Sequence, residues 1–325
     1  MNYKQPFYTL RLNSQNCGYR ITVNGCFIEE QRHGEMNVME YPINQWLKNG
    51  DNLFDIYHIN IPTPAGITGL RNDGKLTLEL CVRENSGSET TIINRTIYDG
   101  SHLKIEDDSV DYTDIEGLLS SLSTSFLTNK FDVVSNKIVP SDTGEFSIED
   151  YQVKKGEYNH ALQTTQNITL PAPFPLWRFF KADELTNHNE LSDEQWEATR
   201  KNMINEVYQP VWKALRDNDA KALKALFLER GKEYDQAFYK EEGKDVYEMV
   251  VHLRSLVDNE DLSPVRDLNI NACDVAVAFN NKLTWLHDWD LSLSEKIEFE
   301  HLGTDLLTSI PLKFARFDGK WEIVR

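Results

Sequence analysis

The first 105 residues alternate between apolar and polar positions with a period of two, in short runs separated by turn residues. In residues 19–23 an apolar side chain stands at every second position, and the run ends at Asn24-Gly25. This pair is typical of two-residue hairpin turns. Apolar residues resume at 26–28 after this turn, and a strict alternation returns in residues 76–80. Many short strands with frequent turns predict an all-β sandwich over residues 1–105.

The chain changes to a helical period near residue 193. Ser192 followed by Gln195 has the spacing of a capping box, which predicts the start of a helix. Pro210 lies inside the first helical run and predicts a kink or break, and residues 217–219 restart the helix. Three apolar faces with helical spacing are formed by Trp196, Met203, Val207, Val211, Trp212 and Leu215, then by Ala222, Leu223, Leu226, Phe227 and Tyr234, and then by Val246, Met249, Val250, Leu253 and Leu256.

From residue 268 onward the period returns to two. Strands are expected within residues 270–279, 282–286, 298–302, 312–317 and 321–324, and Asp318-Gly319 predicts a hairpin between the last two. Helices followed by an antiparallel sheet are typical of an α+β domain, here over residues 193–325.

Residues 106–192 differ in composition from both flanks and are expected to connect the two domains. Six carboxylates fall within eleven residues that include no basic side chain: Glu106, Asp107, Asp108, Asp111, Asp114 and Glu116. This acidic cluster does not have the spacing of an EF-hand calcium loop. It indicates either a solvated face or linker, or a contact surface for a basic partner. Residues 115–127 are expected to form a short helix, and residues 169–177 an extended, proline-rich segment packed against a domain.

Residues 18–25 and 41–52 contain a strand, an Asn-Gly turn, a short helix and a Gly-Asp-Asn turn that leads into a strand. This pattern resembles that of the jelly-roll, galactose-binding-like sandwiches, and the resemblance as a whole covers about a third of the chain. Its matching residues are structural, because Asn24-Gly25 supplies positive φ and Gly50 ends a helical turn. The resemblance therefore implies a fold and no sugar-binding residues.

The order of elements after residue 193, with residues 212–219 ahead of Leu223 and Leu226, is similar to a nuclear-transport-factor-like cone. The similarity covers about 130 residues. It implies helices packed against a curved antiparallel sheet.

Composition excludes a disordered chain, because 40% of the 325 residues are hydrophobic and 11% are aromatic. The 34 Lys and Arg residues against 52 Asp and Glu residues give a net charge of −18. Such acidity argues against binding to nucleic acid or to anionic membranes. The start of the chain has the pattern of a strand and not of a signal peptide, and no apolar stretch is long enough to span a bilayer. We therefore expect a cytoplasmic protein.

The four cysteines, Cys17, Cys26, Cys81 and Cys273, form no CxxC pair. They are expected to be free and mostly buried thiols, although one bridge among the first three stays open.

The densest group of polar and aromatic residues is Trp285, His287, Asp288, Trp289 and Asp290. His287 and Asp288 have the chemistry of a general acid/base pair at the mouth of a cone. However, neighbours on a strand point to opposite faces, which favours a structural role. The sequence contains no HExxH, no histidine–carboxylate cluster with metal spacing, no glycine-rich phosphate loop and no GxSxG. We therefore expect no cofactor, no metal and no catalysis.

Residues 168–178, ITLPAPFPLWR, resemble a segment of bacterial proteins encoded beside secreted polymorphic toxins such as type VI effectors. The resemblance implies an immunity protein that inactivates its cognate toxin by covering it. An acidic inhibitor suits a basic toxin, because opposite potentials accelerate association. The acidic cluster is then the expected partner-binding surface.

Two alternatives stay open. One is a small-ligand-binding protein or an enzyme that uses the cavity of the C-terminal domain, with His287 and Asp288 at its mouth and Trp285 and Trp289 beside them. The other is a carbohydrate-binding accessory protein, which the missing export signal disfavours.

Overall fold

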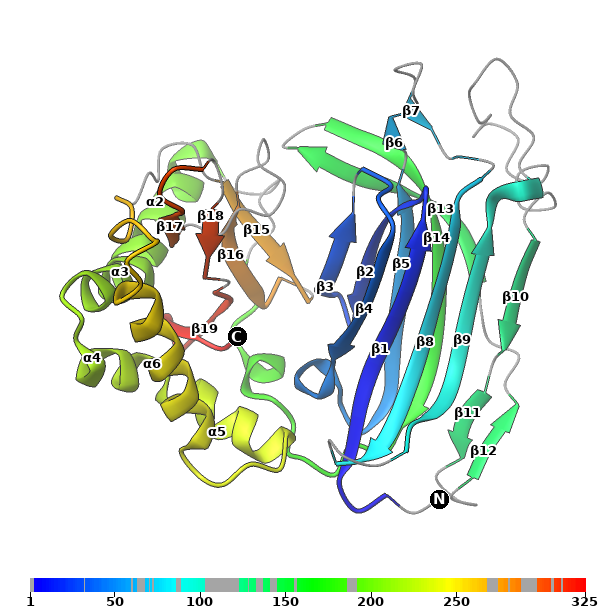
Figure 1. Ribbon diagram of the computed structural model, residues 1–325, viewed down its shortest axis with the longest axis horizontal. Coiled ribbons are helices and arrows are strands. Elements are labelled where there is room, and N and C mark those ends of the chain that lie inside the picture. The colour runs from blue at the N-terminus through cyan, green and yellow to red at the C-terminus, as the bar shows by residue number, and fades with distance from the viewer. Residues whose placement is uncertain are drawn as a thin grey trace. The chain divides into compact units, whose positions relative to one another are not determined.

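Every strand pairing that the structure describes is antiparallel, and the α-helices it describes all follow residue 192 (Figure 1). The protein is therefore a mixed α+β protein whose N-terminal half is built from strands. The computed structural model describes residues 3–31, 33–59, 61–62, 68–69, 71, 73–85, 89–102, 123–127, 129–132, 137–140, 145–154, 157–185, 192–267, 274–279, 281–287, 297–304, 307–310 and 312–325.

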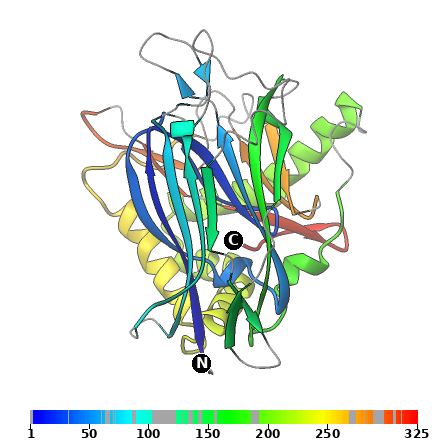
Figure 2. The ribbon, with the colours of Figure 1, turned by 90° about the vertical axis from the view of Figure 1, so that its right-hand side faces the viewer.

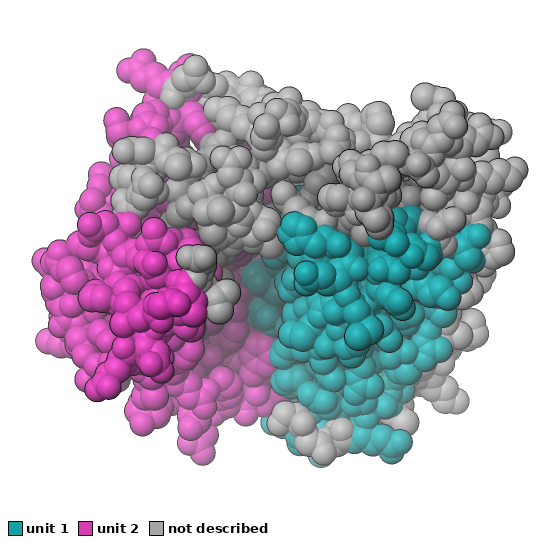
Figure 3. All heavy atoms as spheres, turned by 45° about the horizontal axis from the view of Figure 1, so that its top comes forward, with its two compact units in different colours: residues 1–175 teal, residues 176–325 magenta. Residues whose placement is uncertain are grey.

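The chain divides into two compact units, residues 1–175 and residues 176–325 (Figure 3). The first unit contains two five-stranded sheets. The first sheet has the order β10-β9-β8-β1-β4, with β1 (Pro6–Gln15), β4 (Asn37–Pro42), β8 (Lys75–Glu84), β9 (Thr91–Asp99) and β10 (Ser123–Leu127). Figure 2 shows its long strands β1, β8 and β9 side by side.

The second sheet has the order β13-β14-β5-β2-β3, with β2 (Gly18–Val23), β3 (Cys26–Gln31), β5 (Gly50–Ile59), β13 (Glu145–Lys154) and β14 (Glu157–Leu170). Two short hairpins pair β6 (Ile61–Pro62) with β7 (Thr68–Gly69) and β11 (Asn129–Asp132) with β12 (Lys137–Pro140). The turns η1 (Asn44–Trp46) and η2 (Gly100–His102) are 3₁₀-helical.

Strands β13 and β14 lie in the region that we expected to connect two domains. β14 pairs with β5 from Leu162, opposite His58, to Leu170, opposite Gly50. Strands β13 and β14 therefore contribute to a sheet of the first unit. The predicted helix over residues 115–127 is wrong for residues 123–127, which form β10, and residues 115–122 lie outside the described residues. Ser123, Thr124 and Ser125 favour the extended conformation once β9 offers a partner strand.

The proline-rich segment packs as predicted. Ala172, Phe174 and Trp177 are all buried, and residues 171–177 form no helix or strand before η3 (Arg178–Lys181) begins. Proline prevents this segment from continuing as a helix, and its apolar side chains keep it packed.

Cys17, Cys26 and Cys81 are free and buried, so no bridge links these three; Cys273 lies outside the described residues. Burial raises the pKa of Cys17 to about 12 and that of Cys81 to about 11. Both thiols therefore stay protonated at neutral pH, as small apolar core groups do.

The second unit begins with helices. They are α2 (Asp193–Met203), the π-helical turn η5 (Ile204–Tyr208), α3 (Gln209–Arg216), α4 (Ala220–Leu226), α5 (Leu228–Ala237) and α6 (Lys244–Val257). No helix in the described part of the chain is both long and apolar enough to cross a membrane.

The signals that the sequence carries for these helices are confirmed. Ser192 and Gln195 form the predicted capping box at α2. The helix widens into the π turn η5 just before Pro210, because proline offers no N–H to the carbonyl four residues earlier. Asp219 restarts the helix by accepting hydrogen bonds from the main-chain N–H groups of Lys221 and Ala222, each 3.0 Å long.

An antiparallel sheet follows, in the order β15-β16-β19-β20, with β15 (Asp274–Ala278), β16 (Leu283–His287), β19 (Phe314–Phe317) and β20 (Lys320–Ile323). A separate hairpin pairs β17 (Glu298–Glu300) with β18 (Leu307–Ser309). Tyr208 joins the helices to the four-stranded sheet. Its ring lies edge-on to Phe314 at 4.7 Å between centroids, and its hydroxyl accepts a 2.8 Å hydrogen bond from the main-chain N–H of Leu286.

The two predicted tight turns both form. Asn24 and Gly25 have φ of 52° and 71°, and Asp318 and Gly319 have φ of 50° and 79°. Positive φ at both central residues is the requirement of a type I′ turn, which matches the twist of the strands it joins.

Asp235 caps α6 from a distance. The N-cap residue Gly243 has no side chain that could accept a hydrogen bond. The carboxylate of Asp235, which is 4% exposed, instead accepts 2.7 Å hydrogen bonds from the main-chain N–H groups of Gly243 and Asp245. Two N–H groups that a helix start leaves unpaired are thereby satisfied.

We predict that Asp235→Ala lowers the free energy of unfolding by about 2–4 kcal/mol, because it leaves the buried N–H group of Asp245 and the half-buried N–H group of Gly243 without an acceptor. Glu260→Ala, at an exposed carboxylate, is the control and should change it by less than about 0.5 kcal/mol. Urea unfolding curves measure both values. A loss at Asp235 no larger than at Glu260 would contradict the capping role.

Candidate functional site

A surface hollow of about 460 Å³ opens over β4, β1 and β8 of the first unit. The strand register brings its residues together, because Arg11 stands opposite Glu40 of β4 on one side and Glu79 of β8 on the other. The residues that line it are Arg11, Leu12, Asn13, Val38, Met39, Glu40, Thr77 and Glu79. We call it the β4 hollow.

Charges of alternating sign cross the floor of the β4 hollow. Arg11 Nε lies 3.1 Å from Glu40 Oε2, and Arg83 Nη1 lies 3.3 Å from Glu40 Oε1. In the next pair across the sheet, Arg95 Nη2 lies 2.7 Å from Glu79 Oε1. Cross-strand pairs of opposite charge stabilise one register of a sheet. The floor is thus a fixed pattern of donors and acceptors whose charges are already paired.

These contacts act on the ionisation of Glu40. Partial burial by itself raises the pKa of this carboxyl, but hydrogen bonds from Thr9 and Arg11 and the charges of Arg11 and Arg83 outweigh it. The pKa of Glu40 is therefore lowered, and the carboxylate stays charged well below neutral pH.

The margin of the hollow is apolar and exposed. Met36 is 75% exposed, Val38 is 67% exposed and Met39 is 48% exposed. Val38 and Met39 line the hollow and belong to β4, and Met36 directly precedes this strand. Among the described strands β4 is at the edge of its sheet, so one side of its main chain pairs with no described strand. A single exposed apolar side chain is ordinary, but a group of three on a sheet edge is typical of a surface that binds another protein.

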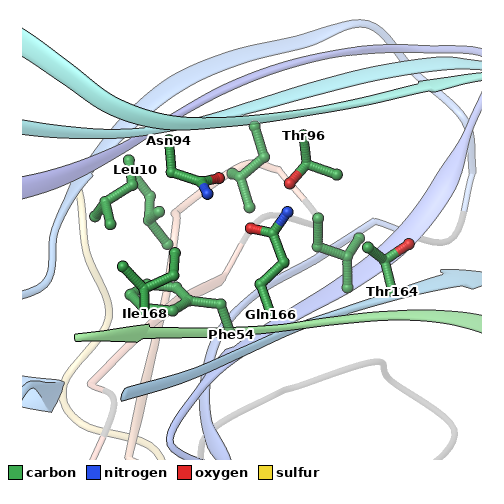
Figure 4. A pocket seen from close by; sticks show the side chains of 10 residues that line it. Leu10, Phe54, Asn94, Thr96, Thr164, Gln166 and Ile168 are labelled. Atoms are coloured by element: carbon green, nitrogen blue, oxygen red, sulfur yellow. The ribbon is translucent and has the colours of Figure 1, made fainter. Parts of the chain in front are cut away.

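The first unit also contains a small internal cavity of about 10 Å³, lined by side chains from both sheets (Figure 4). The first sheet contributes Leu10, Leu78, Leu80, Asn94 and Thr96, and the second contributes Phe54, Ile56, Thr164, Gln166 and Ile168. Its polar lining residues are nearly inaccessible to solvent, since each of the four is at most 4% exposed. We call it the inter-sheet cavity.

His58 lies near this cavity and is completely buried. Its ring stacks on that of Tyr98, with 4.2 Å between centroids, and its Nε2 is 3.3 Å from the hydroxyl of Thr164. Burial lowers the pKa of His58 to about 3, because the positive imidazolium loses its hydration. The imidazole is therefore neutral at physiological pH.

The residues singled out from the sequence are not brought together by the described structure. The acidic cluster, Asp288, Trp289 and Asp290 lie outside the described residues. His287 is the last residue of β16, where its main chain stands opposite Asp274. Trp285 is 8% exposed and packs with Lys313, whose Nζ lies 4.1 Å from the ring centroid. The structural role expected for His287 and Asp288 therefore stays a prediction, and the alternative of a cavity site at these residues stays open.

Sequence reasoning missed the β4 hollow. Thr77 and Glu79 were visible as the polar half of an alternating strand, but nothing in the alternation says which strands become its neighbours. Only the register of β8 with β1 places Glu79 opposite Arg11. Among the described residues, no group of three or more His, Cys, Asp and Glu side chains is placed to hold a metal ion.

Comparison of the chain with protein-family models, with curated proteins and with solved structures finds no significant match.

We predict that His58 makes the protein less stable in mild acid. The unfolded chain takes up a proton near pH 6.5, whereas the folded chain resists protonation down to about pH 3. The free energy of unfolding should therefore fall by about 1.4 kcal/mol per pH unit below pH 6 through this residue alone. Urea unfolding between pH 6.5 and pH 5 measures the slope.

His58→Gln should lose this part of the pH dependence, whereas His252→Gln, at an exposed histidine of α6, should keep it. Equal slopes for the wild type and His58→Gln would show that the buried imidazole is not the cause.

Proposed function

We propose that this chain is a non-enzymatic immunity protein that neutralises a cognate secreted bacterial toxin by direct protein–protein contact. The observation that carries the proposal is the exposed apolar margin of the β4 hollow, formed by Val38 and Met39 of the edge strand β4 and by Met36 directly before it. The β4 hollow combines an apolar margin with a charged floor, and protein interfaces use both kinds of surface.

The charge of the chain supports a basic partner. A net charge of −18 attracts a positively charged protein over long distances and repels nucleic acid. The floor of the β4 hollow contributes little to this attraction, because Glu40 and Glu79 are each paired with arginine. In this proposal the acidic cluster, residues 106–116, guides the encounter, and the β4 margin contributes to the lifetime of the complex. The toxin would be one delivered by a type VI or related system, and the complex would form in the cytoplasm.

The proposal includes the finer architecture of both units. We infer that the first unit is a β-sandwich of jelly-roll type, which the lining of the inter-sheet cavity by both five-stranded sheets supports. We infer that the second unit is a cone, which the common core of its helices and its sheet supports. That core includes Tyr208, Val211, Leu253, Leu286, Phe314 and Ile323.

The first test concerns the acidic cluster. We predict that replacing Asp107, Asp108 and Asp111 together by Asn slows association with the genomically adjacent toxin several-fold at low salt and changes dissociation less. Binding kinetics over a salt series measure both rates. The effect should shrink as salt rises, because screening removes long-range attraction.

The matched control replaces three exposed carboxylates of the second unit by Gln, namely Glu241, Glu242 and Glu260. Both variants change the net charge from −18 to −15, so a difference between them reports position and not total charge. Unchanged association in the Asp variant removes the acidic cluster from the interface. Failure of the wild type to bind that toxin counts against the immunity function itself.

The second test concerns the β4 margin. We predict that the double variant Met36→Ser and Val38→Ser dissociates from the toxin about tenfold faster or more, because both substitutions remove apolar contact area from the interface. Leu302→Ser is the control, since Leu302 is 61% exposed and belongs to the second unit. Wild-type dissociation in the double variant would mean that β4 lies outside the interface.

A further inference from the structure

Gln166 is buried between the two sheets of the first unit, yet its amide nitrogen has no hydrogen-bond partner among the described residues. The side chain comes from β14 and is 4% exposed, and Nε2 is inaccessible to solvent. A buried N–H group without an acceptor destabilises the folded state, so such groups are rare and call for an explanation.

The amide of Gln166 points into the inter-sheet cavity. Asn94 and Thr96 project from β9 toward it from the opposite side, as Figure 4 shows. Three side chains that can donate or accept hydrogen bonds thus converge from two different sheets. The remaining walls come mainly from the apolar side chains of Leu10, Phe54, Ile56, Leu78, Leu80 and Ile168.

The size and chemistry of the cavity restrict its occupant. Its volume of about 10 Å³ is about the minimum that admits one water molecule. A larger ligand does not fit. None of the lining residues carries a charge, so nothing in the cavity compensates the desolvation of an ion. A water molecule in such a site needs between two and four polar partners, and Gln166, Asn94 and Thr96 provide them.

We propose that the inter-sheet cavity is a binding site for one ordered water molecule that joins the two sheets. The water accepts a hydrogen bond from Gln166 Nε2 and donates to the side-chain oxygens of Asn94 and Thr96. It fixes β14 relative to β9, because a shift of either strand by two residues removes the partners. This site is independent of the proposed toxin contact.

The first experiment detects the water in the full chain by NMR. Cross-relaxation between water and the side-chain amide protons of Gln166 should be visible both as a nuclear Overhauser effect and as a rotating-frame Overhauser effect. The two effects should have opposite signs, which is the signature of a water molecule that stays bound for a long time. Thr96→Val removes one partner with almost no change in shape, and it should weaken or abolish this signal. A wild-type protein without the signal overturns the proposal.

The second experiment uses the sign of a stability change. In Gln166→Met, whose side chain has a similar volume, a bound water loses one partner and leaves Asn94 and Thr96 incompletely satisfied. The Tm of the transition that unfolds the first unit should therefore fall by about 2–6 °C. Without a bound water the same change removes an unpaired buried amide, and Tm should rise. A Tm that rises or stays constant overturns the proposal.

The double variant of Gln166→Met and Thr96→Val connects the two experiments. Because both side chains bind the same water, their effects on Tm should be less than additive. Strict additivity would mean that they do not share a ligand, and it overturns the bridging arrangement.

Discussion

Three buried asparagines hold the first unit together where its chain passes from one sheet to the other. The segment between β4 and β5 leaves the first sheet and enters the second, so its main chain loses the hydrogen bonds of a strand ladder. Asn44, within this segment, replaces them for the neighbouring strand β1, because its side chain accepts from Tyr8 N (2.8 Å) and donates to Pro6 O (3.1 Å). Asn24 and Asn52 replace them for the segment itself, because Asn24 Nδ2 donates to Trp46 O (2.8 Å) and Asn52 Oδ1 accepts from Lys48 N (2.9 Å). The constraint that every buried polar group needs a partner thus determines the path of the chain.

The second unit obeys the same constraint with charged groups. Asp235 accepts from two N–H groups at the start of α6, and Arg230 lies 2.6 Å from Asp245 in the first turn of that helix. Glu206, in the π turn, accepts from the main-chain N–H of Trp321 at 3.2 Å and so ties the helices to the last strand of the sheet. Removal of a charged acceptor from such a site leaves its N–H donors without a partner. This is why we expect the free energy of unfolding to fall when Asp235 is replaced.

Local signals in the sequence predicted the elements whose causes are local. Asn24-Gly25 and Asp318-Gly319 specify their turns by backbone conformation, Ser192 and Gln195 bond each other within one helical turn, and Pro210 acts on the turn before it. The free thiols could also be predicted, since Cys17, Cys26 and Cys81 are spaced without a pairing motif.

The same reasoning failed at β14. Every second side chain in the described part of β14 is buried, as in a regular strand. Two of these inward positions, however, hold the polar residues Thr164 and Gln166, so the sequence does not alternate between apolar and polar residues. Those polar residues fit the core because of what stands opposite them, namely His58 beside Thr164 and the β9 side chains across from Gln166. The β4 hollow was unpredictable for a related reason, since its floor exists only in the register that aligns Glu40, Arg11 and Glu79.

The charge of the protein and the charge of the β4 hollow have different consequences for binding. Long-range attraction depends on unpaired charge and decays over about 10 Å at moderate salt, so it governs how often two proteins meet. Glu40 is paired with Arg11 and Arg83, so it adds little to that field and instead requires a partner to match a fixed pattern of donors and acceptors. The exposed side chains of Met36 and Val38 lose contact with water only when the partner fits closely. This division of roles supports the proposed immunity function, because a specific toxin inhibitor has to attract a basic protein from a distance and to retain only one whose shape matches its binding surface.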